Sequence, residues 1–506
     1  MIGFDDLPRG LPRKLSKDDT APRAMWVPPE GLNQTPQWGG GFRPETPFEW
    51  TAPLVGQDRN GNWLCLDDDR HMLTVAGSRA GKGVSVILPN LATYSGSVLV
   101  LDPKGENADL TAERRGKGRN IAAGGLNQEV FVLDPFKWAK DVPDEYRAGF
   151  NPLADLDPSD PMFVDHCDSI ADALVVSEKG KENDHWSATA RLVLRAFIAW
   201  VAAGSGGRRD LVEVSRLLHL PMAPKDAANN PDAYFDDLLD AMLDDPNRAW
   251  GVPATGAGAL LSMGHEERGS VLSTVRQNIL FVSSPLMGKM LSGDGRQPDL
   301  KAWKYGGHSI YLVLPAGLLH RHSRFFRLIL NRLLAAVEAT DPVPRDQPKG
   351  LMILDEMHVL GHMAAVETAA GLLAGYGVRI WSIWQDFTQA SGIYGERWQT
   401  LLGNASLFQS FGLNDPMTLK VVSDRLGPSS VMKISQSGVT YDDAIHGRKN
   451  QSSSIESVPL LTPDEVSYHF SRASDAQLVI YPGASPIWMR RLNYWNDDFA
   501  KLRRQA

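Results

Sequence analysis

Continuous apolar runs, rich in valine, isoleucine and leucine, recur along the chain and are separated by stretches with helical spacing of their apolar positions. Strands that are buried on both faces have this pattern, and alternation with helices indicates a parallel sheet. The pattern therefore predicts an α/β fold. The runs are HMLTVAG (71–77), SVLVLD (97–102), EVFVLD (129–134), SIYLVLP (309–315), GLMILDE (350–356), VRIWSIWQD (378–386) and QLVIYPG (477–483).

Between about 165 and 300 the apolar residues follow helical spacing and no clear strand occurs, as in WSATARLVLRAFIAWVAA, DLVEVSRLLHL, YFDDLLDAML and GSVLSTVRQNILFV. Joints rich in glycine and proline, such as GSGGRRD and WGVPATGAGA, separate these stretches. We predict an inserted all-α domain over 165–300, between the two parts of an α/β domain over 49–164 and 301–506.

The first 48 residues are rich in proline and charge, which predicts an extended arm over 1–48. Tryptophans at positions 26, 38 and 50 indicate that parts of this region dock on something. The polar stretch Ser435–Ser457 is typical of a mobile loop.

Composition narrows the classes of protein. The chain has 506 residues, of which 43% are hydrophobic and 22% charged, and its net charge is −8, so any DNA contact must come from a local patch or a channel. Cys65 and Cys167 are the two cysteines, which excludes a disulfide framework and makes a structural zinc site unexpected. No apolar run approaches the ~18–20 residues that span a bilayer, which predicts a soluble, cytoplasmic chain whose attachment to the inner membrane, if any, is made through partners.

The segment AGSRAGKGV, after the first apolar run, resembles a phosphate-binding loop. Such a loop needs small residues, so that backbone N–H groups can turn toward the β-phosphate, and a lysine whose ammonium reaches the β- and γ-phosphate oxygens. We expect nucleotide contacts from Gly77, Ser78, Arg79, Ala80, Gly81, Lys82, Gly83 and Val84.

Two positions depart from the usual phosphate-loop pattern. Ala76 occupies the place of the first glycine, and Gly83 occupies the place of the serine or threonine that would bind Mg²⁺. Water, or as the weaker alternative Ser85, must then replace that ligand. A glycine-rich strand-to-helix turn with an accidental lysine is the alternative interpretation of this segment.

Acidic and amide side chains follow two later strands. Asp355 and Glu356 end the run LMILDE, where in a nucleotide hydrolase the first acid holds Mg²⁺ and the second acts as general base on the attacking water. A strand-end acid pair that caps a helix is the alternative. Gln385 ends the run VRIWSIWQ, where it can sense the γ-phosphate, or serve only as a satisfied strand-end glutamine.

Taken together, these segments resemble the type IV coupling proteins, from about residue 60 to the C-terminus. The shared motifs, in the same order, are AGSRAGKGVSVILPNL, SVLVLDPKGEN, VFVLDPF, FNPL, ILDEMHVLG, GYGVRIWSIWQDFTQ, IYG and PLLTPDEV. The GKG ending of the loop is similar to a variant known in that family.

The resemblance implies a RecA-like P-loop nucleotide-binding domain with a mostly parallel sheet, an inserted all-α domain that selects cargo, ATP and Mg²⁺ as cofactors, and a homo-hexamer. It implies a motor that delivers DNA, or a relaxase–DNA complex, to a type IV secretion or conjugation channel. The family also has N-terminal membrane helices, which this sequence lacks, and Arg379 is the arginine nearest to the segment in which the family places a subunit-bridging arginine.

Two alternative functions stay open. The cargo of the ATPase could be effector proteins only, or the chain could be a nucleotide-gated adaptor with weak hydrolysis, as the missing hydroxyl at Gly83 suggests. The short basic stretches HGRKN and RRLNYW are more typical of a solvated surface than of a DNA contact.

Overall fold

The computed structural model describes residues 24, 26, 42–44, 50–58, 60–176, 184–204, 207–221, 234–344, 346–436 and 451–504. Within the predicted arm over 1–48, only residues 24, 26 and 42–44 are described, so Trp38 lies outside the described residues. The stretch HGRKN (446–450) also lies outside them. The described chain forms two compact units, Met1–Asn90 with Trp381–Asn496 and Leu91–Ile380 with Asp497–Ala506.

The first unit is built on a mixed sheet with the strand order β1-β3-β2-β14-β13-β10-β4-β9. Strand β4 pairs in parallel with both β9 and β10, whereas the pairs from β10 outward to β1 are antiparallel. The strands are β1 Phe42–Pro44, β2 Leu54–Gln57, β3 Trp63–Leu66, β4 His71–Ala76, β9 Val378–Trp384, β10 Ala405–Phe411, β13 Ala476–Ile480 and β14 Ile487–Arg490.

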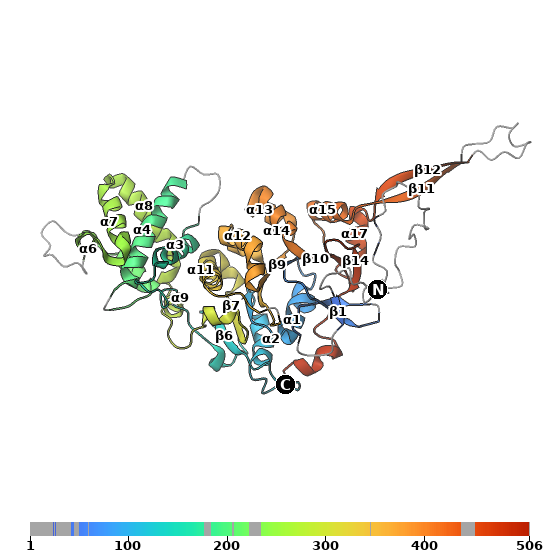
Figure 1. Cartoon of the computed structure of the whole chain (residues 1–506), viewed down its shortest axis with the longest axis horizontal. Coiled ribbons are helices and arrows are strands. Elements are labelled where there is room, and N and C mark those ends of the chain that lie inside the picture. The colour runs from blue at the N-terminus through green and yellow to red at the C-terminus, as the bar shows by residue number, and fades with distance from the viewer. Residues whose placement is uncertain are drawn as a thin grey trace, which may run out of the picture. The chain divides into compact units, whose positions relative to one another are not determined.

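Helices and a hairpin complete the first unit. The helices are α1 Leu88–Thr93, which runs into the second unit, α13 Phe387–Tyr394, α14 Trp398–Gly403, α15 Pro416–Leu426 and α17 Pro463–His469. The two-stranded hairpin of β11 Pro428–Gln436 and β12 Gln451–Pro459 extends away from them in Figure 1. The predicted loop Ser435–Ser457 is therefore wrong at both ends, where cross-strand pairing reaches Gln436 and Gln451.

A buried chain of polar side chains crosses the strands of the first unit. The Nε1 of Trp381 donates to the hydroxyl of Thr74 (2.8 Å), which donates to the Oε1 of Gln409 (2.8 Å). The Nε2 of Gln409 donates to the Oε1 of Gln477 (2.5 Å), whose own Nε2 donates to the carbonyl of Val55 (2.8 Å). Because an unpaired buried amide is costly, this network favours one register of the strands.

Tryptophans near the N-terminal end of the chain contact the first unit. Trp50 is fully buried and stacks on Trp63 with a centroid distance of 5.7 Å. Trp26 lies edge-on to Trp488 at 5.6 Å. Two of the three tryptophans noted in the sequence therefore pack against this unit.

The turn before β4 is held by Asp68, and this contact predicts a pH-dependent stability. Burial raises the pKa of Asp68, but hydrogen bonds from Arg70 and Tyr481 outweigh it and bring the pKa to about 2, below its usual 3.8. The stability that this carboxylate contributes is complete above about pH 4 and is lost as the pH falls toward 2. We expect Asp68→Asn to lower the thermal midpoint at pH 7, and the difference from wild type to shrink at pH 3.

Thermal melts of wild type, Asp68→Asn and the neighbouring exposed-site control Asp69→Asn at both pH values check this expectation. The control should follow the wild type. If the thermal midpoint of Asp68→Asn lies as far below that of wild type at pH 3 as at pH 7, the assigned hydrogen bonds are contradicted.

The second unit contains an all-parallel set of strands in the order β8-β5-β7-β6. The strands are β5 Val98–Asp102, β6 Glu129–Leu133, β7 His308–Val313 and β8 Gly350–Leu354. Every apolar run that is predicted to form a strand contains a strand in the structure, in one unit or the other. The antiparallel pairing of β13 departs from the predicted parallel sheet, because its apolar run has the same composition as those of the parallel strands.

The helices between β6 and β7 form a bundle in which α3, α4, α6, α7 and α8 lie together (Figure 1). The stretches with helical spacing are helices in the structure, and no strand occurs among the described residues from 163 to 303. The segment WGVPATGAGA (250–259), expected as a joint, lies largely within α7 instead. In the described part of the chain, every helix is too short or too polar to act as a membrane span. The helices of the second unit are α2 Glu106–Arg115, α3 Phe163–Leu174, α4 Asp184–Ala202, α5 Leu211–Leu218, α6 Phe235–Asp244, α7 Val252–Ser262, α8 His265–Ile279, α9 Pro285–Leu291, α10 Leu300–Trp303, α11 Leu319–Glu338 and α12 Ala364–Leu372.

Candidate nucleotide site

The glycine-rich segment forms a tight turn between the end of β4 and a helix. The N–H of Ala80 donates to the carbonyl of Gly77 (3.1 Å), and the N–H of Ser85 donates to the carbonyl of Gly81 (2.8 Å). Gly81 has a φ of 98°, which only glycine adopts without strain, and Arg79 has a φ of 56°. Successive backbone groups therefore turn sharply here, as a phosphate loop requires.

The loop continues into a helix that begins irregularly. Gly83–Ile87 is π-helical and leads into α1. Lys82 is buried, with 9% of its surface exposed, and Ser78 and Arg79 are exposed. A Cβ atom at Gly83 would meet no atom within 4 Å, so this position has space for a larger side chain.

Close packing against β10 fixes the back of the loop. A Cβ atom at Gly77 would lie 2.2 Å from the carbonyl oxygen of Gly412, and one at Gly412 would lie 2.5 Å from the Cβ of Ala80. Gly412 also has a φ of 62°. Small residues at these positions are therefore required both by the close approach and by the backbone conformation.

Gln385 lies beside the loop within the first unit. Val75 of β4 pairs with Trp384 of β9, so Gln385 follows its strand at the level at which Ala76 leads into the loop. Asp386, the next residue, accepts the N–H of Gln389 (2.8 Å) and caps α13. The structure thus places Gln385 at the same end of the strands as the glycine-rich loop, and it assigns the adjacent aspartate a structural role.

Asp355 and Glu356 follow β8 in the second unit. The N–H of Glu356 donates to the Oδ1 of Asp355 (3.0 Å), and Glu356 has a φ of 53°, which is uncommon for a residue other than glycine. The Nδ1 of His358 lies 3.4 Å from the Oε2 of Glu356. A meeting of this acid pair with Lys82 of the first unit stays a prediction.

Asp102, at the end of β5, belongs to the same edge of the second unit. Val100 of β5 pairs with Ile353 of β8, and the two strands are parallel. Asp102 and Asp355, each two residues further along, are therefore level with each other. Burial raises the pKa of Asp102 to about 7, backbone N–H groups of Ala108 and Asn107 oppose this rise, and the Asp355 carboxyl adds to it. Asp102 also accepts the N–H of Ala108 (2.9 Å), so it fixes the start of α2.

Two arginines lie differently from what their sequence context indicates. Arg379, in β9, is buried, with only 4% of its surface exposed. In RRLNYW, Arg490 is exposed and pairs with Asp475 (3.2 Å), as expected for a solvated stretch. That interpretation is wrong for Arg491, which is directed inward and donates to the carbonyl of Ala80 in the phosphate loop (2.8 Å). A double arginine at a strand end carries no signal that distinguishes the two.

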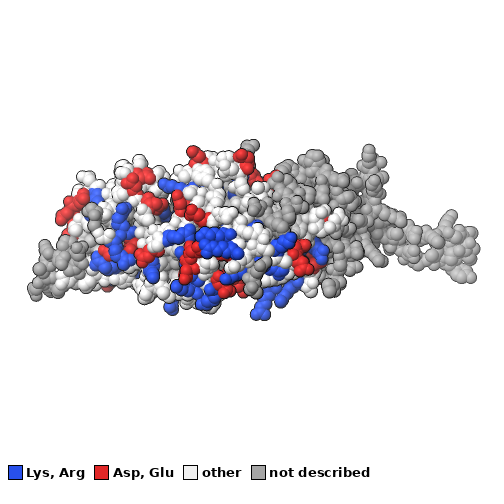
Figure 2. All heavy atoms as spheres, turned by 90° about the horizontal axis from the view of Figure 1, so that it is seen from below, with Lys and Arg blue, Asp and Glu red and all other residues white. Residues whose placement is uncertain are grey.

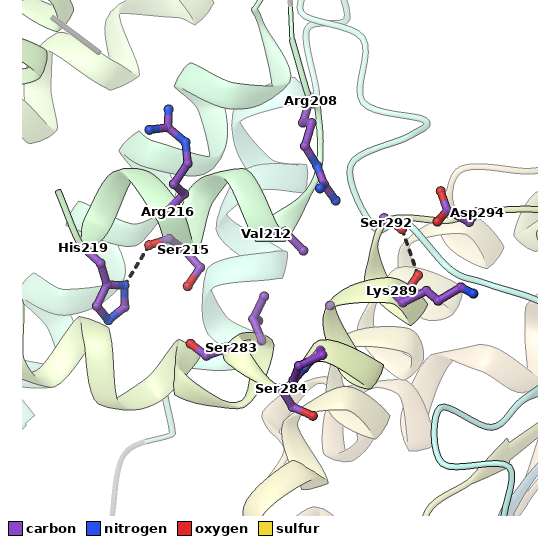
Figure 3. A pocket seen from close by; sticks show the side chains of 13 residues that line it. Arg208, Val212, Ser215, Arg216, His219, Ser283, Ser284, Lys289, Ser292 and Asp294 are labelled. Atoms are coloured by element: carbon purple, nitrogen blue, oxygen red, sulfur yellow. Dashed lines mark hydrogen bonds between the residues drawn. The ribbon is translucent and has the colours of Figure 1, made fainter. Parts of the chain in front are cut away.

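A separate cavity of about 540 Å³ lies in the second unit between α5 and α9 (Figure 3). Arg208 and Arg216 at its edge already pair with Asp210 (2.8 Å) and Glu213 (2.7 Å). Asp294 lines the same cavity. The two arginine charges are therefore balanced within the protein, whereas Lys289 also lines the cavity.

Comparison with known proteins places this fold and sequence in one group. A family model described as type IV secretory system conjugative DNA transfer matches residues 43–506. The conjugal transfer protein TraG of Escherichia coli is 27% identical over 499 residues, which cover 90% of this chain and 72% of that protein. Protein VirD4 of Rhizobium rhizogenes is 25% identical and is matched over 86% of this chain and 60% of its own length.

Solved structures of a conjugative coupling protein share the fold. Unbound TrwBdeltaN70 matches 91% of this chain and 99% of its own with a TM-score of 0.63 and 16% identity. TrwB in complex with ADP and Mg²⁺ matches 96% and 97% with a TM-score of 0.61 and 14% identity. The expected α/β fold with a mostly parallel sheet is therefore confirmed, and the chain belongs to the type IV secretory system conjugative DNA transfer family.

Proposed function

We propose that the chain is an ATP-driven coupling protein, which moves DNA or a relaxase–DNA complex toward a type IV secretion or conjugation channel. The observation that carries the proposal is the phosphate-loop turn after β4, with Gln385 on the neighbouring strand. Family membership and the nucleotide-bound TrwB structures of the same fold support it.

In this proposal each site residue has one task. The loop amides from Gly77 to Val84 and the Lys82 ammonium hold the phosphates, and Glu356 takes the proton of the attacking water. Gln385 contacts the γ-phosphate and changes its contact when that phosphate leaves. Closure of the site requires the acid pair of the second unit to meet the loop of the first.

The residues at the strand ends of the second unit fit a magnesium ion. Asp102 and Asp355 end neighbouring strands, and their mutual repulsion is one cause of the raised pKa of Asp102. Mg²⁺ typically binds through one or two carboxylates and the substrate phosphates. Asp355 would hold the ion, which would neutralise charge that develops on the phosphates.

The open space at Gly83 gives a direct test of this metal site. Gly83→Ser would restore the hydroxyl that most phosphate loops supply, at a position where the added Cβ meets no atom within 4 Å. We expect the Mg²⁺ concentration for half-maximal ATP hydrolysis to fall about tenfold, a typical size for the gain of a metal-site contact. Gly83→Ala, which adds the Cβ without the hydroxyl, is the matched control and should leave the Mg²⁺ requirement unchanged. Equal requirements in both variants would contradict a metal at this position.

We further propose that the chain works as a homo-hexamer, in which DNA follows a channel without sequence reading, and that the helices over 165–300 select cargo. On the face drawn in Figure 2, Lys and Arg gather in several groups with Asp and Glu between them, so the acidic net charge does not exclude local contact with phosphates. We place the working protein in the cytoplasm, with partners at the inner membrane.

The deciding experiment measures ATP hydrolysis with and without single-stranded DNA over a range of salt concentrations, with molecular mass measured at several protein concentrations. Salt-sensitive stimulation by DNA, with formation of a ring, supports the DNA motor. Hydrolysis that ignores DNA favours a cargo of effector proteins. Negligible hydrolysis under all conditions favours the nucleotide-gated adaptor, which the glycine at position 83 suggests.

A further inference from the structure

The segment that follows β14 reaches the phosphate loop through Arg491. Its Nη1 donates to the carbonyl of Ala80 (2.8 Å), and its Nη2 donates to the carbonyls of Arg472 (3.2 Å) and Ser474. All three acceptors are main-chain oxygens. One guanidinium therefore ties the loop to the turn that precedes β13.

The surroundings of Arg491 favour a fixed position for this side chain. Its guanidinium lies over the ring of Phe411, 5.0 Å from the centroid, and its own N–H donates to the carbonyl of Asp475 (2.7 Å). Burial lowers the pKa of Arg491, and the Asp475 carboxylate opposes this effect. An arginine stays charged in such a place, and its planar fork serves several carbonyls at once, which a lysine cannot do.

The hydrogen bond to the Ala80 carbonyl fixes the orientation of the peptide group between Ala80 and Gly81. In a trans peptide the carbonyl of one residue and the N–H of the next point in opposite directions. The hydrogen bond from Arg491 to the Ala80 carbonyl therefore directs the N–H of Gly81 away from Arg491. Gly412 limits Ala80 on another side, since a Cβ there would lie 2.5 Å from the Ala80 Cβ.

The same segment also contacts the helix that follows the loop. The N–H of Tyr494 donates to the carbonyl of Val84 (3.0 Å). Residues 491–494 thus hold the chain on both sides of Lys82, at Ala80 and at Val84. We call residues 491–494 the loop clamp.

We infer that Arg491 is a positioning residue for nucleotide binding, which keeps the phosphate loop in its binding conformation through the Ala80 carbonyl. This inference rests on the proposed function, because it presumes that the loop binds a nucleotide. Arg491 would touch no phosphate, so its loss should weaken binding and leave the chemical step largely intact. A role in general stability alone would lower the melting temperature and leave the affinity of folded molecules unchanged.

The test measures the Kd for ATP by titration well below the melting temperature, together with kcat and KM, in the full chain. We expect Arg491→Ala to raise Kd and KM about tenfold with kcat changed less than about twofold, since a misdirected loop must be reordered by the ligand. Arg491→Lys, which keeps the charge and fewer donors, should give an intermediate Kd. Arg490→Ala, at the exposed neighbour, should bind like the wild type.

The outcomes separate this inference from the proposed function. A wild-type protein that binds no ATP overturns the proposed function and this role with it. A wild type that binds ATP, with Arg491→Ala or, if that variant does not fold, Arg491→Lys at the same Kd, overturns only the positioning role. A Kd that rises in Arg491→Ala and recovers partly in Arg491→Lys supports it.

Discussion

Lys82→Ala should reduce the kcat/KM for ATP hydrolysis at least about 10²–10³-fold, the range for loss of one group that stabilises transition-state charge. Lys82 directly follows the turn in which Gly81 adopts a φ of 98°, and its side chain is buried at the start of the helix. A truncated side chain removes the ammonium that would reach the phosphates, while the loop backbone keeps its hydrogen bonds to Gly77 and Gly81. We therefore expect transport of cargo to stop although the protein folds.

The measurement compares steady-state ATP hydrolysis and melting temperature for wild type, Lys82→Ala and Lys420→Ala. Lys420 is an exposed lysine on α15 of the same unit, 3.6 Å from Asp424, and it is a matched control because its removal deletes the same charge far from the loop in sequence. The control should keep full activity. Turnover by Lys82→Ala within about twofold of wild type would exclude the phosphate loop as the nucleotide site.

The sequence predicts the strands of the sheet well because burial on both faces leaves a continuous apolar run. The run GLMILDE becomes β8 with its acids at the carboxyl end, and VRIWSIWQD becomes β9 with Gln385 beside the loop. In each case a local pattern is sufficient, since the strand end, the polar residue and the following turn are adjacent in the chain.

What the sequence does not predict depends on partners that are distant in the chain. Strands β2 and β14 have four residues each, and the space around them is closely filled from distant parts of the chain: a Cβ atom at Gly56 would lie 2.4 Å from the Nε2 of Gln477 and 2.5 Å from the Sδ of Met489. The inward direction of Arg491 depends on carbonyls at Ala80 and Ser474. Local patterns of apolar and polar residues carry no information on contacts between distant parts of the chain. The loop clamp can therefore be identified only from the folded structure.

Glu356→Gln should reduce kcat for ATP about 10²–10⁴-fold, the usual contribution of a general base, and should leave the affinity for ATP within a few-fold of wild type. The amide has the size of the carboxylate but cannot accept the proton of the attacking water. The backbone of Glu356, with a φ of 53°, is strained to a similar degree with either side chain, so the melting temperature should change little. Loss of turnover with retained binding is the signature of a missing base.

Measured beside the wild type, the same variant decides between motor and adaptor. If the wild type hydrolyses ATP and Glu356→Gln traps it unhydrolysed, Glu356 acts in the chemical step and the acid pair of β8 must close on the phosphate loop during turnover. Equal and negligible rates in both proteins would leave nucleotide binding as the only task of the loop. Asp386→Asn is the matched control, because Asp386 also follows a strand but caps α13. Asparagine caps a helix about as well as aspartate, so we expect this variant to keep both its stability and its kcat close to wild type.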